Sequence, residues 1–520
     1  MTMKKVFLKC LISTILLVGI TNSNVYALTL DYIKGTDRYE TASIIASKMN
    51  YSSAILVNGL SIVDGLSASG LSGAVNAPIL LTKKDQIPSS TLSKLSSANT
   101  IYIVGGTTVV SSEVENSLRS MGKSIIRLGG LDRYSTSITV ANEIEKIKGV
   151  QEIYYVNGAR GEADAMSIAP VAANTGNPVI LTDGVSTSYK RNIQAYSIGG
   201  TTVLNSSFDV FSQRINGLNR FETNKNVINM FFPDKTHVNL SKSDVLIDAL
   251  TASALKEPVV LVSDNSDKTA INGAHSATVF GDISQTAINR SKGHIYGEKV
   301  IFYIQHQDDE TIFAGSAIVD AIEAVGSENV HIVLITDGSN SEVFNWNRYV
   351  NLPINEKVAL RNNEFNAAIT QLGVNLNNVI YLNQLEGNIN YDYLRQTVNY
   401  FENNFSNVTH VAHSYKYDTH PQHLTSGQVI YSLYNDGVIK DCRFFATPTE
   451  ISALNKNLLI ENIADNPQEK IKVLSAIEEY KLDKGDMIRE GIGYKSVSRL
   501  FNALTSDPNL TSYLHEPESK

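Results

Sequence analysis

Short apolar runs alternate with amphipathic stretches along most of the chain. In the first half, the runs lie at 53–58, 79–82, 100–104 and 152–157, and stretches with helical spacing of apolar residues separate them. Runs of this length are typical of buried strands. Because strands that alternate with helices pair in parallel, the pattern predicts small parallel α/β sheets.

The same alternation continues in the second half. Lys299–Gln305 is an apolar run, Glu310–Val325 carries apolar residues at helical spacing, and Val330–Ile335 is a second run. This order is that of a βαβ unit. A further strand is expected at Asn407–Ala412, so we predict a Rossmann-like parallel α/β domain. Its polar end, Asp507–Lys520, is expected to fray.

One phrase, Gly-x-Asp/Asn-Arg-aromatic-x-Thr, occurs three times, at 35–41, 130–136 and 217–223. Repetition at such intervals predicts like structural units. A chain of 520 residues is also too long for a single core. We expect three modules, the third one trimmed, followed by one larger domain, with boundaries at 28–126, 127–215, 216–292 and 293–520.

Each copy of the phrase is followed by an aspartate that precedes small residues. These residues are Asp64, Asp164 and Asp248. Aspartate is a preferred residue at the start of a helix, so we interpret all three as helix N-caps.

The amino-terminal segment 1–27 has the pattern of a secretory signal peptide. Three lysines precede an apolar run at 11–20, and Val25-Tyr26-Ala27 forms a small-residue cleavage site. The run is too short to span a bilayer, and no later run is longer, so we expect a secreted protein without a membrane span. Without the three lysines, 41 basic and 52 acidic residues give a formal charge of −11. This balance disfavours nucleic acid as a partner.

Two histidine-containing segments follow predicted strands of the second half. His306-Gln-Asp-Asp-Glu310 follows one strand, and His420-Pro-Gln-His423 comes after another. The carboxyl ends of parallel strands meet at one edge of a sheet, so we expect the segments to converge. Zinc that activates water takes three His or carboxylate ligands and keeps one position open. His306, Asp309 and His423 fit this count, and Fe²⁺ is compatible with the same ligands.

These segments resemble the LmbE-like (PIG-L) zinc de-N-acetylases, whose motifs read His-Pro-Asp-Asp-Glu and His-Pro-Asp-His. The helix with Arg361-Asn-Asn-Glu364 is similar to the same family, and the resemblance spans about 298–423. It implies an enzyme that removes acetyl groups from N-acetylglucosamine units. It also implies a role for each motif residue: zinc ligation by His306, Asp309 and His423, proton transfer by Asp308, and stabilisation of the tetrahedral intermediate and leaving amine by His420.

Two residues depart from the family motifs. Gln307 replaces proline, and Gln422 replaces an aspartate that could orient a ligand histidine. The alternative is therefore a non-catalytic surface-layer or adhesive protein that binds glycan through a degenerate domain. Arg361, Asp337 and His413 are further candidates for support of the site or contact with substrate. A solvated ion pair with Glu364 is the alternative for Arg361, and a turn explains Asp337 equally well. For His413 a structural role is favoured.

The three repeats resemble the type 2 cell-wall-binding repeats of clostridial surface proteins. This resemblance implies a pseudo-trimer of modules that attaches the protein non-covalently to an anionic wall polysaccharide. We therefore expect a location at the cell wall or surface layer, with an N-acetylated amino sugar as substrate. Arg38, Arg133 and Arg220 either contact the polymer or brace the modules.

Overall fold

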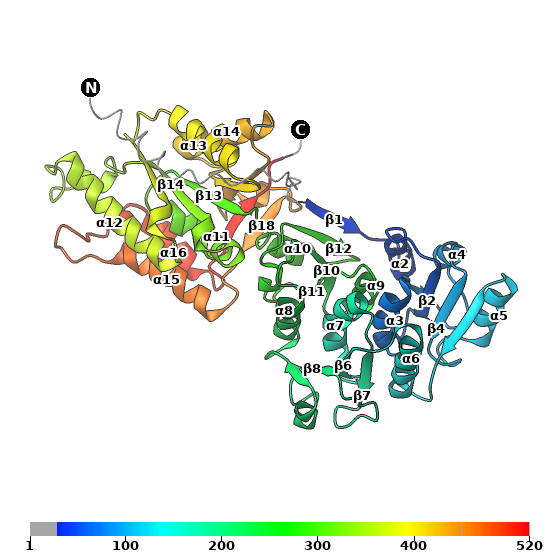
Figure 1. The fold of residues 1–520 in the computed structure, drawn as a ribbon. Helices are drawn as coiled ribbons and strands as arrows, with labels where there is room; N and C mark the ends of the chain where they lie inside the picture. Colours follow the sequence, from blue (N-terminus) through cyan, green and yellow to red (C-terminus); the bar gives the residue numbers. More distant parts are fainter. Residues whose placement is uncertain (1–28, 449, 519–520) are drawn as a thin grey trace.

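The computed structural model describes residues 29–448 and 450–518, so the predicted signal peptide lies outside the described residues. The first half forms three small sheets and the second half one larger sheet (Figure 1). The predicted α/β class, with three small parallel sheets, is confirmed. No helix of the described residues is long and apolar enough to cross a membrane.

The three small sheets share one parallel strand order. The first is β3 (Ile79–Thr82), β2 (Ser53–Asn58), β4 (Thr100–Val104) and β5 (Ser124–Leu128). The second is β7 (Val179–Thr182), β6 (Glu152–Asn157), β8 (Gln194–Ile198) and β9 (Gln213–Ile215). The third is β11 (Val259–Val262), β10 (His237–Lys242), β12 (Ser276–Phe280) and β1 (Thr29–Ile33).

The third sheet is completed by the first described strand of the chain. β5 and β9 are the fourth strands of their sheets, and each lies just before the next copy of the repeated phrase. β1 lies just before the first copy and pairs in parallel with β12, from Thr29 opposite Ser276 to Ile33 opposite Phe280. The chain therefore joins its beginning to the end of the third module and closes the three modules into a ring.

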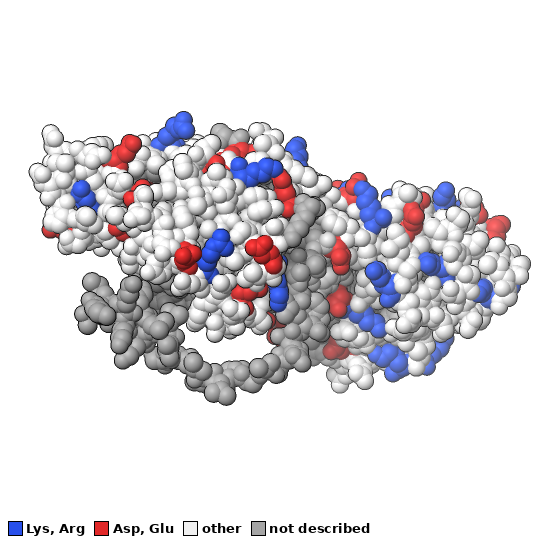
Figure 2. Space-filling view, turned by 90° about the horizontal axis from the view of Figure 1, so that it is seen from above, with Lys and Arg blue, Asp and Glu red and all other residues white. Residues whose placement is uncertain are grey.

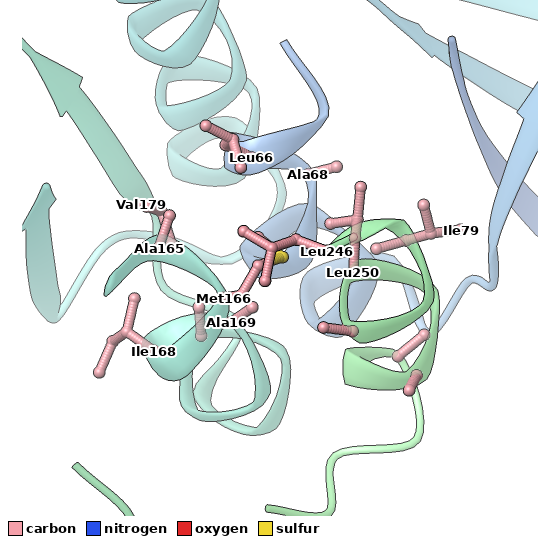
Figure 3. Packing of buried hydrophobic residues seen from close by; sticks show 14 of the residues in the cluster. Leu66, Ala68, Ile79, Ala165, Met166, Ile168, Ala169, Val179, Leu246 and Leu250 are labelled. Atoms are coloured by element: carbon pink, nitrogen blue, oxygen red, sulfur yellow. The ribbon is translucent and has the colours of Figure 1, made fainter. Parts of the chain in front are cut away.

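The modules pack through their helices around a shared apolar core. Leu66, Met166 and Leu250, one from each module, are buried in the same cluster (Figure 3). Gly73 lets two helices approach, since a Cβ there would lie 2.0 Å from the carbonyl oxygen of Ala173. The helices of this half are α2 (Arg38–Ala46), α3 (Ala68–Val75), α4 (Ser89–Leu95), α5 (Ser112–Ser120), α6 (Arg133–Lys148), α7 (Glu162–Thr175), α8 (Arg220–Phe231), α9 (Ile247–Ser253) and α10 (Gln285–Lys292).

The interpretation of Asp64, Asp164 and Asp248 as helix N-caps is wrong. Asp64 precedes a short 3₁₀ turn without a capping hydrogen bond, and the other two lie inside α7 and α9. The caps come from the repeated phrase itself, where Asp37, Asp132 and Asn219 accept hydrogen bonds from the first turns of α2, α6 and α8.

The larger sheet is mixed rather than wholly parallel. Its order is β15 (Val379–Gln384), β14 (Val330–Thr336), β13 (Lys299–Ile304), β16 (Val408–Ala412), β17 (Asp441–Ala446), β19 (Ser512–His515) and β18 (Leu459–Asn462). The first five strands are parallel, whereas β19 is antiparallel to both of its neighbours. The expected fraying of the polar end is therefore wrong over β19, because the buried residues Ser512 and Leu514 pair with two strands.

Helices cover both faces of this sheet (Figure 1). One face packs against α11 (Asp309–Val325), α12 (Ile354–Leu372), α15 (Pro467–Lys481) and α16 (Ile492–Ser506). The other packs against α13 (Asp392–Asn404) and α14 (Pro421–Asn435).

The two halves meet at a buried polar junction. Residues 291–297, which follow the third module, are buried. Arg443 of β17 donates to the carbonyl oxygens of Lys292 (3.2 Å) and Ile295, and Arg290 pairs with Glu461 at 3.2 Å. These contacts hold the larger sheet directly against the third module.

Candidate active site

The two histidine-containing segments converge at the carboxyl edge of the larger sheet. His306 follows β13, and His413 follows β16, its neighbour in the sheet. His420 is the N-cap residue of α14, and Pro421 occupies the first turn, where its fixed backbone favours helix initiation. His423 therefore projects from the beginning of α14 toward His306, with their ring centroids 5.1 Å apart.

The side chains of His306, Asp309 and His423 form a compact donor set. Nδ1 of His306 lies 3.3 Å from Oδ2 of Asp309 and 3.1 Å from Nε2 of His423. Nε2 of His423 lies 3.2 Å from Oδ2 of Asp309. Tetrahedral zinc with bonds of about 2.0–2.1 Å separates neighbouring ligand atoms by about 3.3 Å. The three atoms fit such a metal without rearrangement.

A fourth group, His413, lies beside this donor set. Its Nε2 is 3.3 Å from Oδ2 of Asp309, and its ring stacks on that of His423 at 3.8 Å. Burial opposes ionisation of Asp309, yet the positive charges of His423 and His413 hold the pKa of this carboxyl well below its usual range. Asp309 is therefore an anion inside a group of imidazoles.

Asp418 orients His423 and was not found from the sequence. Its Oδ2 lies 2.9 Å from Nδ1 of His423, and its Oδ1 accepts the backbone N–H of His420 at 2.8 Å. The amide oxygen of Gln422 accepts from Nε2 of His306 at 2.8 Å. A carboxylate five residues before His423 thus orients a ligand histidine, the role considered from the sequence for an aspartate at residue 422. The only signal for it was an acidic residue in the loop before the helix.

Asp308 is held in a turn by two buried neighbours. Its φ of 110° lies in the left-handed region, which non-glycine residues rarely adopt. Nη2 of Arg361 donates to its Oδ2 at 2.7 Å and to the carbonyl oxygen of Gln307. Glu310 accepts the backbone N–H of Asp308 at 3.0 Å. Burial raises the pKa of Asp308, and Arg361 opposes this rise.

The arrangement of this turn separates the two adjacent aspartates. Asp308 points to Arg361, whereas Asp309 points to the imidazoles. Arg361 is buried and donates to Asp308, Gln307 and Glu364, so it supports the site from behind.

Gln307 is buried and fits the structure without proline. Its Nε2 donates to the carbonyl oxygen of Asp337 at 3.2 Å and to Oδ1 of Asn362 at 3.0 Å. Its Oε1 occupies the space beside Gly338, where a Cβ would lie only 2.2 Å away. The Asp337 side chain accepts from the N–H and hydroxyl of Ser339, and this contact makes it a turn residue.

His420 and Glu386 border the donor set on its open side. The His420 ring is exposed and lies 4.4 Å from that of His423 and 5.0 Å from that of His306. Burial of part of the ring and the neighbouring His423 and His306 lower the pKa of His420 to about 4. Oε1 of Glu386, on the loop after β15, lies 3.7 Å from Nε2 of His306. Glu386 belongs to no motif, so the sequence could not identify it as a residue of the site.

The three repeated arginines each make one hydrogen bond to the backbone, although Arg220 is exposed and the other two are half-buried. Each donates through Nη1 to the carbonyl oxygen of the residue that follows β2, β6 or β10 of its own module. The bonds join Arg38 to Gly59 (2.6 Å), Arg133 to Gly158 (2.5 Å) and Arg220 to Ser243 (2.7 Å). Burial raises the pKa of three aspartates, and the charge of an arginine from a neighbouring module opposes each rise: Arg38 acts on Asp248, Arg133 on Asp64 and Arg220 on Asp164. This arrangement is compatible with a bracing role.

Two family models match the chain. The model of cell wall binding domain 2 (CWB2) matches residues 33–115, 127–209 and 214–330, together more than half of the chain. The model described as GlcNAc-PI de-N-acetylase (PIG-L) matches residues 301–434. The resemblances identified from the sequence are therefore confirmed, and the second match contains the donor set.

Curated and solved proteins match the chain over different lengths. The N-acetylmuramoyl-L-alanine amidase LytC of Bacillus subtilis is 28% identical over 316 residues, which are 55% of this chain and 63% of LytC. The chain thus spans less than two thirds of that relative. Cwp8 from Clostridium difficile is 29% identical over 50% of each chain, with a TM-score of 0.47. Cwp6 from Clostridium difficile is 23% identical over 76% of this chain and 66% of its own, with a TM-score of 0.48.

Proposed function

This chain belongs to the cell wall binding domain 2 family, with three repeats followed by a PIG-L de-N-acetylase domain, and we propose that it is a wall-attached, metal-dependent de-N-acetylase. Its substrate would be an N-acetylated amino sugar of the N-acetylglucosamine type. The observation that carries this proposal is the donor set of His306, Asp309 and His423, whose ligand atoms lie 3.1–3.3 Å apart, with Asp308 next to Asp309 in the same turn.

His306, Asp309 and His423 would hold the metal, which is zinc in our proposal, and Fe²⁺ suits the same donors. When bound, the metal polarises the acetyl carbonyl and increases the acidity of water. Asp418 and Gln422 keep the two imidazoles in the orientation that ligation requires, because each accepts from the ring nitrogen on the far side of the donor set.

Asp308 and His420 divide the proton transfers. Asp308 takes the proton of the attacking water, and Arg361 fixes the position of its carboxylate. His420 lies at the open side of the donor set, where its neutral imidazole can stabilise the tetrahedral intermediate and relay the proton from Asp308 to the departing amine. The products are acetate and a free amino sugar.

The charge distribution supports attachment through the repeats. Residues 28–292 carry 24 basic and 23 acidic side chains, whereas residues 293–520 carry 17 basic and 29 acidic ones. An anionic wall polysaccharide is repelled far less by the first part. Basic side chains gather along one edge of the repeat half (Figure 2). We propose that this half binds the polymer and that the protein is secreted to the wall or surface layer.

The deacetylase proposal is tested by acetate release from soluble N-acetylglucosamine oligomers. We expect acetate and free amine in equal amounts, loss of both on chelation, and recovery after Zn²⁺ addition. Oligomer binding without acetate release by the zinc-loaded protein would favour the alternative, a non-catalytic glycan-binding protein.

Attachment is tested separately with isolated cell walls. The full chain should sediment with intact walls but not with walls stripped of their anionic polysaccharide. Retention on stripped walls would contradict the proposed partner. Arg38, Arg133 and Arg220 stay candidates for contact with the polymer, because each uses only Nη1 for its bond to a carbonyl oxygen.

A further inference from the structure

A groove of about 570 Å³ runs along the edge strand β15, between this strand and α12. This volume lies within the range of roughly 300–1,000 Å³ that is usual for small-ligand sites. The groove is lined by Asn362, Asn366, Val379, Ile380, Tyr381 and Asn383. None of these side chains carries a formal charge, so the groove suits a neutral ligand.

Two residues that line the groove are connected to segments that reach the donor set. Oδ1 of Asn362 accepts from Gln307, the residue between His306 and Asp308. Asn383 lies at the end of β15, three residues before Glu386, which approaches His306 to 3.7 Å. A chain-like ligand that occupies the groove can therefore extend to the site of the proposed reaction.

Two carboxamides of α12 present hydrogen-bond donors to the groove. Oδ1 of Asn366 accepts from the hydroxyl of Tyr381, and Oδ1 of Asn362 accepts from Gln307. These contacts fix both amides, and within the described part of the chain neither Nδ2 donates to a protein acceptor. Fixed N–H groups beside an aromatic ring match the hydroxyl and acetamido oxygens of a sugar and its apolar face.

We propose that this groove binds a further sugar unit of a neutral N-acetylated glycan, so that the protein acts on sugar chains rather than on single sugars. The inference rests on the proposed function, because it assigns the substrate class of the same site. It also explains the glutamine at residue 307, because Gln307 lies between His306 and Asp308 and donates a hydrogen bond to Asn362 of the groove.

The test compares N-acetylglucosamine oligomers of one to five units as substrates of the zinc-loaded full chain. If the groove binds a sugar unit, kcat/KM should increase sharply at the oligomer length that first reaches the groove.

The double variant Asn366→Ala with Tyr381→Phe removes the polar pair and keeps the ring. It should lower kcat/KM for the longest oligomer by about 10-fold, mainly through KM, and leave the shortest substrate unchanged. Asn355→Ala, at an exposed position of the same helix, is the control and should keep the step.

Three results would contradict a sugar-binding role of the groove. These are a kcat/KM that does not increase with oligomer length in the unmodified protein, the same step in kcat/KM in the double variant, or an equal loss of kcat/KM for all lengths. Failure of the proposed function is distinct, since no oligomer would then release acetate. In that case, calorimetric titration of the five-unit oligomer decides. Weaker oligomer binding by the double variant than by the Asn355→Ala control would support the groove as a sugar-binding site, and equal binding would contradict it.

Discussion

The carboxylate of Asp418 accepts a hydrogen bond from Nδ1 of His423 at 2.9 Å. This contact leaves Nε2 of His423 directed at Asp309 and His306, where a metal ligand is needed. Burial opposes the charge of Asp418, but its hydrogen bond with His423 and the nearby His413, 3.7 Å away, hold its pKa well below the usual range. The carboxylate that the motif lacks at residue 422 is thus supplied from a different position.

We predict that Asp418→Asn weakens metal binding by about 10- to 100-fold, the usual cost of losing a carboxylate behind a ligand histidine. Competition with a chromophoric chelator measures the affinity. Asp392→Asn, at an exposed position on α13, is the control and should bind metal as the unmodified protein does. Unchanged affinity in Asp418→Asn would mean that Gln422 alone orients the donor set.

A second prediction concerns the close contact of Gln307 with Gly338. In Gly338→Ala the new Cβ would meet Oε1 of Gln307 at 2.2 Å, in addition to its strain at a φ of 70°. Gly437 has a φ of 71° with nothing within 4 Å, so Gly437→Ala isolates the backbone strain. We expect Gly437→Ala to cost about 1 kcal/mol and Gly338→Ala about 1–3 kcal/mol more, measured by denaturant unfolding. Equal costs would show that Gln307 moves aside freely.

A third prediction follows from the buried Asp164 of α7. Burial raises the pKa of Asp164 to about 7, although Arg220 opposes the rise. The folded state therefore binds this proton more tightly than the unfolded state, in which the pKa is about 3.9. Stability from this group is present at low pH and is lost as pH rises toward 7.

Asp164→Asn should therefore be more stable than the unmodified protein at pH 8, and this difference should shrink at pH 5. Melting temperatures at the two values, taken at one ionic strength, measure it. Because Asp64 and Asp248 are present in both proteins, the comparison isolates residue 164. A stability difference that does not change with pH would show that Asp164 is ionised in the fold.

The fourth prediction concerns the strand that closes the ring. A chain that begins at Lys34 lacks β1, so β12 becomes an edge strand, and the apolar contacts of the buried Ile33 are lost. We expect a melting temperature about 5–10 °C lower and a tendency to aggregate. Asp31→Ala changes an exposed side chain and keeps the pairing, so it should behave as the unmodified protein.

Local patterns predicted much of this fold, because strands such as Ser53–Asn58 and Lys299–Ile304 are apolar runs with clear ends. Partners distant in sequence were not predictable in this way. Nothing in Thr29–Ile33 specifies pairing with Ser276–Phe280. In β19 the polar residues Ser512 and His515 are buried because distant segments cover them, and His515 contacts Ser414.

The same distinction holds for the candidate site. His306, Asp309 and His423 belong to motifs, and they lie together. Asp418 and Glu386 approach the site only because their loops return to the edge of the sheet. The repeated arginines illustrate the converse, since repetition alone could not distinguish a polymer contact from the contacts with carbonyl oxygens that the structure has.

The last prediction separates the roles of the two adjacent aspartates. Asp308→Asn should retain the metal, because Arg361 holds Oδ2 of Asp308, whereas Asp309 supplies the carboxylate of the donor set. It should lose about 10² to 10⁴ in turnover, because an amide of nearly equal volume cannot take the proton of the attacking water. Asp309→Asn should instead lower both metal content and turnover, because Oδ2 of Asp309 lies within 3.3 Å of three imidazole nitrogens.

Elemental analysis and acetate release, measured on the same preparations, distinguish the two variants. Glu356→Gln, at an exposed position on α12, serves as the control for a change of one charge. If Asp308→Asn released acetate at the unmodified rate, the base would have to be another group, and Glu386, 3.7 Å from His306, would be the first to examine. If Asp308→Asn lost the metal and Asp309→Asn kept it, the assignment of the pair would be reversed, and Asp308 would replace Asp309 in the donor set.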